Sequence, residues 1–323
     1  NNDRLEYNDS TAPVNVNLGT GAVSGGYAQG DTISNFEDLN GSNFDDTLTG
    51  DAQDNYLRGY DGDDTINGGA GDDELHGGEG ADALDGGAGT DSASYFYASA
   101  GVTVNLATGG TAGSANGDTY TSIENVGGSQ FDDIIVGDVN ANRISAQGGD
   151  DTITGGSAND EILGGSGTDT AVYTGNLANY IITDAGGGDF SIYDDRAGSL
   201  DGTDLVHSDV ENLQFTDFTV ATSTIVMGDG NTNILSGNST LLGNGGNDTL
   251  TGTAGNDLLV GGADTDTMDG GEGSDNYLIG LNHGNDVFTD TGAAGTDSII
   301  AAADNVAIGI SGNLNGGSGI EVV

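Results

Sequence analysis

The sequence contains no cysteine, only four basic residues and no long hydrophobic run. Without cysteine the chain has no disulfide framework and no thiolate metal site. The basic residues are Arg4, Arg58, Arg143 and Arg196, against 52 acidic residues, and the formal net charge is −48. This charge argues against nucleic acid or an anionic membrane surface as a partner. No segment approaches the roughly 20 apolar residues that a membrane-spanning helix needs.

Hydrophobic residues are scarce as well, at 34% of 323 residues, and 61 residues are glycine. A thick globular core is hard to build from this mixture, and the composition by itself favours disorder. A regular period argues otherwise, because glycine and aspartate return every nine residues with an aliphatic residue two positions after each aspartate. A solenoid that buries one aliphatic side chain per short strand needs no thick core.

The period is a nonapeptide of the form Gly-Gly-x-Gly-x-Asp-x-(Leu/Ile)-x. A first block has six copies over 41–94, and a second has five over 128–172. A third, less regular block covers 228–278 and slips out of phase at Gly237–Leu242, which is three residues short of a copy. Position 8 is mostly aliphatic and positions 7 and 9 are mostly polar, as in a strand with one face turned inward.

A longer repeat contains these blocks. Val14–Leu18 returns as Val102–Leu106, 88 residues later, and 40–46 returns as 127–133, 87 residues later. The alternating side chains of Val102–Leu106 predict a strand. Each long module is therefore a β-rich connector followed by a nonapeptide block.

The ends of the chain match the interior of this module. Asp3–Tyr7 aligns with Asp91–Tyr95, and Gly319–Val323 resembles Ser122–Val126, which precedes a block. We therefore expect the chain to be cut from a longer repetitive protein, in which case the lack of a signal peptide or a catalytic domain carries no weight.

The turn residues suit a hard cation. Glycine at positions 1, 2 and 4 permits positive φ and brings carbonyl oxygens close together. Aspartate at position 6 adds a carboxylate oxygen, and Ca²⁺ takes six to eight oxygen ligands. Carboxylates on strands ~4.8 Å apart repel each other by roughly 3.5 kcal/mol at an effective dielectric constant of 20. We therefore expect folding to require calcium.

The nonapeptide resembles the RTX (repeats-in-toxin) calcium-binding β-roll family. The resemblance implies two nonapeptides per coil and calcium between stacked loops, held by position-6 aspartates and turn carbonyls, with about ten ions in all. The aspartates it implies as ligands are Asp46, Asp64, Asp73, Asp82, Asp91, Asp133, Asp151, Asp160, Asp169, Asp248, Asp257, Asp266 and Asp275. The glycines are Gly59, Gly62, Gly68, Gly71, Gly77, Gly80, Gly86, Gly89, Gly155, Gly164, Gly252, Gly261 and Gly270.

The first turns of the first two blocks depart from the pattern. Asn55 and Asn142 replace the position-6 aspartate, and Phe44 and Phe131 replace the position-4 glycine. We expect weak or missing calcium at these turns.

Catalysis finds little support in the residues. His76, His207 and His283 stand far apart without a metal-binding or catalytic motif, and His76 occupies an outward position 9, where we expect a solvated side chain. Tyr95-Phe96-Tyr97 is the densest aromatic cluster. We expect it to cap the end of a block, with stacking on sugar rings as the alternative.

The predicted fold is all-β: an elongated, right-handed parallel β-roll or β-helix solenoid with calcium-binding turns and short β-strand connectors. The expected divisions are 1–40 (end of a preceding repeat and connector), 41–94 (block 1), 95–127 (connector), 128–172 (block 2), 173–227 (connector), 228–278 (block 3) and 279–323 (connector and start of the next module).

Large repetitive RTX proteins are typically exported by type I secretion and fold outside the bacterial cell, where calcium is plentiful. The resemblance therefore implies a non-enzymatic structural segment of a secreted, cell-surface protein, such as a surface layer (S-layer), adhesin or filament. Its expected partners are calcium, neighbouring copies or modules and surface polysaccharide. The alternatives are the accessory calcium module of a secreted hydrolase, epimerase or toxin, and a carbohydrate-binding module.

Overall fold

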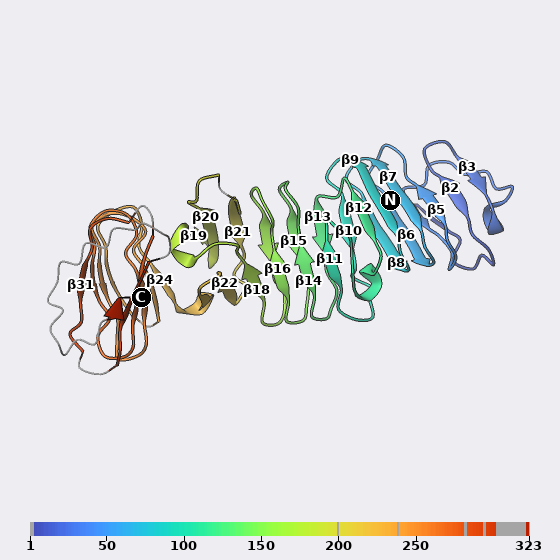
Figure 1. Cartoon of the computed structure of the whole chain (residues 1–323). Coiled ribbons are helices and arrows are strands. Elements are labelled where there is room, and N and C mark those ends of the chain that lie inside the picture. Colours follow the sequence, from blue (N-terminus) through green and yellow to red (C-terminus); the bar gives the residue numbers. More distant parts are fainter. Residues whose placement is uncertain are drawn as a thin grey trace. The chain divides into compact units, whose positions relative to one another are not determined.

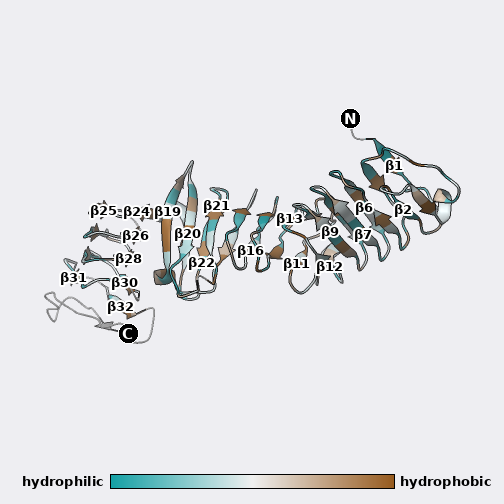
Figure 2. Ribbon diagram, turned by 90° about the horizontal axis from the view of Figure 1, so that it is seen from above, coloured by the Kyte–Doolittle hydropathy of each residue, from teal (hydrophilic) through white to brown (hydrophobic). Residues whose placement is uncertain are grey.

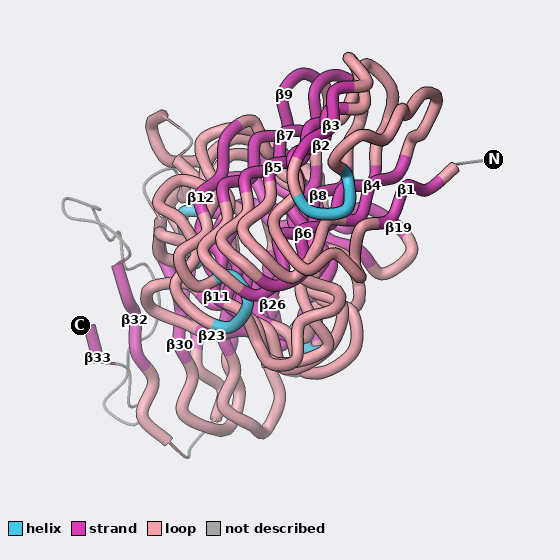
Figure 3. Tube along the Cα trace, turned by 90° about the vertical axis from the view of Figure 1, so that its right-hand side faces the viewer, coloured by secondary structure: helices cyan, strands magenta, loops and turns pink. Residues whose placement is uncertain are grey.

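The computed structural model describes residues 3–198, 200–237, 239–280, 283–292, 295–301 and 321–322. The chain divides into two compact units, Asn1–Ala171 and Val172–Val323. Within the described residues the structure consists of strands and loops with only four short 3-10 helices (Figure 3). None of the helices in these residues has the length and apolar character needed to cross a membrane.

The first unit is a stack of parallel β-coils, to which one edge strand, Ala22–Ser24, adds in antiparallel orientation (Figure 1). Its strands are β1 (Arg4–Glu6), β2 (Asn15–Asn17), β3 (Ala22–Ser24), β4 (Asp38–Asn40), β5 (Thr47–Thr49), β6 (Tyr56–Asp61), β7 (Thr65–Ala70), β8 (Glu74–Glu79), β9 (Ala83–Ala88), β10 (Ser92–Ser94), β11 (Thr103–Asn105), β12 (Thr119–Thr121), β13 (Asn125–Gly127), β14 (Ile134–Val136), β15 (Arg143–Ser145), β16 (Thr152–Thr154), β17 (Glu161–Leu163) and β18 (Thr170–Val172). The 3-10 helices η1 (Gly26–Ala28) and η2 (Gly113–Ala115) lie in its connectors.

The register of the parallel strands sets two nonapeptides per coil, as predicted. Leu48 lies opposite Ile66, and Ile66 lies opposite Leu84, so each strand pairs with the strand two copies later. Leu57 and Leu75 pair in the same way on the other face of the coil. These position-8 side chains are all at most 1% exposed. The solenoid core is therefore a column of aliphatic side chains, and hydrophobic and hydrophilic segments alternate along the strands (Figure 2).

The connectors of the first unit continue the stack. Val16 of β2 pairs with Leu48, and Val104 of β11 pairs with Ile135, which confirms the strand predicted over Val102–Leu106. At the end of the first block, β12 adds to β9 and β13 adds to β10. Strand β13 then pairs with β15 of the second block, so one face of the solenoid runs through the connector without a break.

The ends of the chain were predicted to repeat the interior. Leu5 of β1 pairs with Leu39 of β4, as Ala93 of β10 pairs with Val126 of β13. The predicted match of 319–323 to the interior lies largely outside the described residues, which include only β33 (Glu321–Val322).

The second unit begins with antiparallel strands and ends as a solenoid. It contains β19 (Tyr180–Gly186), β20 (Asp189–Asp194), β21 (Thr203–Val206), β22 (Asn212–Gln214), β23 (Thr219–Ala221), β24 (Ile225–Met227), β25 (Ile234–Ser236), β26 (Thr240–Leu242), β27 (Thr249–Thr251), β28 (Leu258–Val260), β29 (Thr267–Asp269), β30 (Asn276–Ile279), β31 (Val287–Thr289), β32 (Ser298–Ala301) and β33, with helices η3 (Leu177–Asn179) and η4 (Thr222–Thr224). Strands β19, β20 and β21 form an antiparallel meander, and β22 pairs with β23 as a hairpin. The predicted connector of short strands is present, but its antiparallel pairing departs from the parallel arrangement.

The phase slip in the third block is absorbed by a coil of 15 residues. Ile234 pairs with Thr249, whereas the following coils return to a spacing of 18, as in Thr249 with Thr267. The shortened copy places Ser239 in the turn where an aspartate stands elsewhere, and its amide donates to Asp257 Oδ1 at 2.6 Å. A deletion of three residues is therefore confined to one turn and leaves the strands in register.

Two details differ from the predictions. Strands β6 to β9 extend over six residues, so positions 1 to 3 continue the strand instead of starting a turn. His76, expected to be solvated, is only 4% exposed. Its ring lies 4.7 Å from that of Tyr56 and 5.4 Å from that of Tyr97, because the chain after β10 folds back over the outer face.

Candidate calcium sites

The predicted ligand aspartates form buried columns along the turns. Every one of them is at most 3% exposed, although an ionised carboxylate normally stays in water. The set is Asp46, Asp64, Asp73, Asp82, Asp91, Asp133, Asp151, Asp160, Asp169, Asp248, Asp257, Asp266 and Asp275. Burial of so many carboxylates is costly unless each one is paired or coordinated.

One oxygen of each column carboxylate reaches back to the preceding coil. The amide of Asp46 donates to Asp64 Oδ1 at 2.7 Å, and the amide of Asp64 donates to Asp82 Oδ1 at 2.8 Å. The same bond recurs on the opposite side between Asp73 and Asp91 at 2.8 Å. It recurs in the other blocks, for example from Asp133 to Asp151 and from Asp248 to Asp266. The ladder of hydrogen bonds fixes where each carboxylate points.

The second oxygen of many of these carboxylates has no hydrogen-bond donor. It is buried and accepts no hydrogen bond in Asp64, Asp73, Asp82, Asp91, Asp151, Asp248, Asp266, Asp275 and Asp286. A buried carboxylate oxygen without a donor is strongly destabilising unless a cation binds it. The residues therefore fit the calcium that their chemistry implies.

Carbonyl oxygens approach the same space. A Cβ atom added to Gly59 would lie 1.9 Å from Asp64 Oδ2 and 2.7 Å from the carbonyl oxygen of Gly77, on the next coil. At Gly68 the corresponding distances are 2.2 Å to Asp73 Oδ2 and 2.6 Å to the carbonyl oxygen of Gly86. Carboxylate and carbonyl oxygens from successive coils thus converge beside the position-1 glycine, which is the ligand set that Ca²⁺ prefers.

The glycines have two different roles. Gly69 and Gly71, at positions 2 and 4, have φ of 110° and 113°, as predicted. Position-1 glycines such as Gly59 and Gly68 do not have positive φ, so that part of the expectation is wrong. They are required because the carboxylate of their own copy occupies the place of a Cβ atom.

Burial changes the acidity of the columns. Desolvation, with a smaller contribution from neighbouring carboxylates, raises the pKa of Asp64 to about 8 and that of Asp82 to about 7. The same causes raise the pKa of Asp151 to about 7 and that of Asp266 to about 7. These four carboxylates therefore hold protons near neutral pH that a divalent cation would displace.

Within the described residues, no three histidine, aspartate or glutamate side chains gather as a metal-binding cluster. The converging oxygens described above instead come from a carboxylate of one coil and a carbonyl of the next. This arrangement repeats along the stack and does not form a single centre.

The first turns of the blocks are built differently. Asn55 Oδ1 accepts from the Asp51 amide at 2.7 Å, and its Nδ2 donates to the Glu37 carbonyl at 3.0 Å. Asn142 repeats both bonds with Asp138 and Glu124. The amide side chain thus has hydrogen-bond partners for both its oxygen and its nitrogen, and weak or missing calcium at these turns stays a prediction.

Asp46, Asp133 and Asp257 also differ from most of the other column aspartates. In Asp133, Oδ2 accepts from the Ser129 amide at 2.6 Å, and Oδ1 accepts from the Ser129 hydroxyl at 2.8 Å. Ser42 makes the same two contacts with Asp46. A serine at position 2 therefore supplies donors that most later copies lack, and Thr253 supplies them to Asp257 in the third block.

Several acidic residues of these columns were not predicted. Asp118 takes the next place after Asp82, whose amide donates to Asp118 Oδ1 at 2.9 Å. Asp286 and Asp297 extend the third block, accepting from Asp266 and Asp275 over spacings of 20 and 22 residues. The sequence does carry a signal for Asp286, since a hydrophobic residue, Phe288, follows it two positions later. A search at a fixed nine-residue spacing misses this signal.

A second acidic column lies at position 5, which was not predicted to have a role. The amide of Asp63 donates to Asp45 Oδ1 at 3.0 Å, and that of Ala81 donates to Asp63 Oδ1 at 2.9 Å. These exposed carboxylates reach towards the following coil, whereas those of position 6 reach towards the preceding one. Doubled Asp-Asp pairs in the sequence mark the positions where both occur.

Comparison with known families decides what these repeats are. The RTX calcium-binding nonapeptide repeat (4 copies) matches residues 40–75, 58–93, 127–159, 136–171 and 242–277. The chain contains RTX calcium-binding repeats. The repeats match the stacked coils and carry the buried carboxylates described above, and the all-β solenoid predicted from the resemblance is confirmed.

Other comparisons are less informative. No curated protein matches the chain. Among solved structures, this chain is similar to that of the extracellular lipase LipA from Serratia marcescens, with 22% sequence identity and a TM-score of 0.26. The match covers 57% of this chain and 33% of the lipase chain, so this chain spans about a third of that structure's length.

Proposed function

We propose that this chain is a calcium-dependent structural segment of a secreted protein at the bacterial cell surface, such as a surface layer, an adhesin or a filament. The observation that carries the proposal is the set of buried carboxylate oxygens without a donor, as in Asp64 and Asp82. Their burial in the ionised form is compatible with a stable fold only when a cation is bound. Millimolar calcium outside the cell would then act as the folding signal.

The proposed ligands are the column aspartates and the turn glycines predicted from the sequence. About ten ions would lie between same-side turns of successive coils, each held by carboxylate oxygens and carbonyls. Asn55 and Asn142 would mark turns without a strong site, since their side chains are satisfied by hydrogen bonds. Asp286 and Asp297 would extend the third set beyond its predicted end.

Continuity of the stack supports a structural role. Strand β13 pairs with both β10 and β15, so the connector between the first two blocks transmits the coil register from one block to the next. The proposed arrangement is therefore one of connector-plus-block modules, in which the connectors act as spacers of defined register. Such modules suit an element of a rod or lattice. In this proposal they have no catalytic role.

Sedimentation velocity of the whole chain tests the proposal, first in EDTA and then in increasing calcium up to millimolar concentrations. We expect a slowly sedimenting, expanded chain without calcium, a compact species with it, and concentration-dependent oligomers at the higher calcium concentrations. A compact monomer that never associates would favour the accessory module of a secreted enzyme or toxin. An unchanged sedimentation coefficient would contradict calcium-dependent folding.

A further inference from the structure

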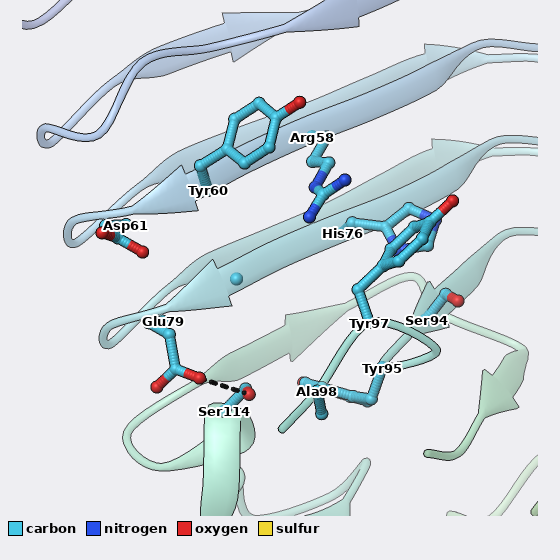
Figure 4. Close-up of a pocket in the computed structure, with 11 residues that line it drawn as sticks. Arg58, Tyr60, Asp61, His76, Glu79, Ser94, Tyr95, Tyr97, Ala98 and Ser114 are labelled. Carbon is cyan, nitrogen blue, oxygen red and sulfur yellow. Dashed lines mark hydrogen bonds between the residues drawn. The ribbon is translucent and has the colours of Figure 1, made fainter. Parts of the chain in front are cut away.

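A pocket of about 190 Å³ lies on the outer face of the first unit (Figure 4). Arg58, Tyr60 and Asp61 come from β6, and Glu79 comes from β8. The loop after β10 supplies Tyr97, and η2 supplies Ser114. Nothing in the calcium-dependent scaffold explains why these side chains gather there.

Arg58 is the centre of the pocket wall. Its guanidinium carbon lies 4.1 Å from the ring centroid of Tyr60 and 4.3 Å from that of Tyr97, so two aromatic faces hold it. Figure 4 shows the Arg58 side chain between Tyr60 and the pair formed by His76 and Tyr97. Ring stacking occupies the flat faces of a guanidinium and leaves its N–H groups, which point outward in the plane, for other partners.

Arg58 is unusual among the arginines of this chain. Across the described residues it has no carboxylate at ion-pair distance, in a protein with 52 acidic residues. The other three arginines are paired, as Arg4–Asp38 at 3.0 Å, Arg143–Glu161 at 3.0 Å and Arg196–Asp194 at 2.8 Å. The aromatic rings therefore hold the Arg58 guanidinium in place, and its N–H groups can donate hydrogen bonds to a ligand.

Acceptors and a fixed aromatic surface complete the pocket. Glu79 Oε1 accepts from the Ser114 hydroxyl at 3.0 Å, which orients that carboxylate beside the pocket. Asp61 adds a second exposed carboxylate. Tyr97 is 57% exposed although its ring packs against that of the buried His76, which is hydrogen bonded to Glu74 at 2.8 Å.

Charge narrows the class of ligand. The pocket wall holds Arg58 against Asp61 and Glu79, and the chain as a whole carries a formal charge of −48, so an anion is repelled. A cation would meet the guanidinium of Arg58 in the centre of the wall. A neutral sugar is repelled neither by the carboxylates nor by the guanidinium. Its hydroxyl groups can accept hydrogen bonds from the guanidinium and donate them to the carboxylates, and its ring can stack on tyrosine.

From this geometry we infer that the pocket binds a neutral pyranose residue of a glycan. The inference does not depend on a surface-layer or filament role. Its calcium dependence does rest on the proposed calcium-dependent folding, because β6, β8 and the loop after β10 come together only when successive coils stack. Binding is then expected to require calcium although no ion touches the sugar.

The test uses the whole chain in millimolar calcium, with circular dichroism and sedimentation velocity to establish that it is folded. Saturation-transfer NMR then measures binding of the methyl glycosides of glucose, galactose and mannose, with methyl glucuronide as the acidic probe. We expect a dissociation constant of roughly millimolar for at least one neutral glycoside. We expect no transfer to the glucuronide, and loss of binding in EDTA.

Two variants locate the binding site. Tyr97→Ala and Arg58→Gln should each weaken binding at least about tenfold, which is the loss of one stacking or charged hydrogen-bond contact. Tyr27→Ala is the matched control, because Tyr27 is equally exposed at 57% and lies on η1, outside the pocket. It should leave binding unchanged.

Failure of this inference is separable from failure of the proposed folding mechanism. A folded, calcium-bound chain that transfers saturation to no neutral glycoside overturns the sugar site and leaves calcium-dependent folding intact. Binding of the glucuronide alone overturns the neutral class, and undiminished binding by Tyr97→Ala overturns the location. Binding that persists in EDTA overturns the coupling to calcium.

Discussion

The backbone amide of Asp46 donates a hydrogen bond of 2.7 Å to Oδ1 of Asp64, on the next coil of the stack. The other oxygen of the Asp64 carboxylate is buried and has no donor. One oxygen therefore holds two coils together by a hydrogen bond, and the other is left for a cation. In the proposed mechanism, repetition of this relationship along the turns would couple the stacking of coils to calcium binding.

Asp64→Asn should remove one calcium ion from the first block and so weaken folding by calcium. Asn55 shows how an amide fits this position, with both of its polar atoms hydrogen bonded. We expect the calcium concentration at the folding midpoint to rise by about threefold to tenfold, because one bound ion is lost. Circular dichroism across a calcium titration measures the midpoint, and native mass spectrometry counts the ions.

The control for this variant is Asp63→Asn at the neighbouring position 5. It makes the same chemical change on an exposed side chain whose Oδ1 accepts from Ala81, a bond that asparagine retains. Its effect on the midpoint should be much smaller. Equal effects from the two variants would show that total charge matters and that the buried oxygen has no special role.

The reverse substitution, Asn55→Asp, should create a calcium site. It removes the donation to the Glu37 carbonyl and buries a new charge, so the first coils should lose about 1–3 kcal/mol of stability in EDTA. With calcium, native mass spectrometry should find one additional ion. Asn8→Asp, at an exposed position, is the control for added charge. An unchanged ion count would mean that the first turn lacks further ligands.

Without calcium, the free energy of unfolding should decrease as the pH rises. The pKa of Asp64 is about 8 and that of Asp82 about 7 in the folded chain, against about 4 in an unfolded chain. The folded state therefore binds more protons, so the stabilising protonation is fully present below about pH 4 and is lost as the pH rises through about 7 to 8. Circular dichroism and sedimentation in EDTA should find more folded chain at low pH.

The same linkage has a consequence for calcium binding. Calcium must displace the protons on these carboxylates, so its apparent affinity should fall as the pH decreases. Calorimetry in buffers of different ionisation enthalpy measures the protons released. An EDTA-treated chain that becomes more stable as the pH rises would contradict the assignment of raised pKa values.

Gly80→Ala should prevent stacking of the first block, whereas Gly30→Ala should be tolerated. Both glycines have positive φ, at 148° and 98°. A Cβ atom at Gly80 would lie 2.0 Å from the Gly62 carbonyl oxygen, but at Gly30 it would meet nothing within 4 Å. We expect a cost of about 1 kcal/mol at Gly30 and about 3 kcal/mol or more at Gly80, measured by chemical denaturation in calcium. Similar costs would show that backbone conformation, and not coil contact, limits the turn.

Much of the solenoid follows from local repetition. The side chain at position 8 is buried in copy after copy, as in Leu57 and Ile66, because a strand turns alternate residues inward and the period of nine keeps them in line. The phase slip before Leu242 was equally visible, since a missing segment of the repeat has to shorten a coil. Asp286 and Asp297 escaped prediction because their coils are longer and leave the nine-residue spacing.

The sequence by itself determined the repeating elements: which side chains face inward, which turns carry carboxylates, and that a hard cation suits them. These features depend on neighbours within one or two copies of the repeat. Only the tertiary structure decided that Oδ2 of Asp64 lacks a donor while Asn55 is satisfied, because both depend on atoms of the adjacent coil. The pocket around Arg58 has the same origin, since Tyr97 reaches it only when the chain after β10 folds back over strands formed earlier.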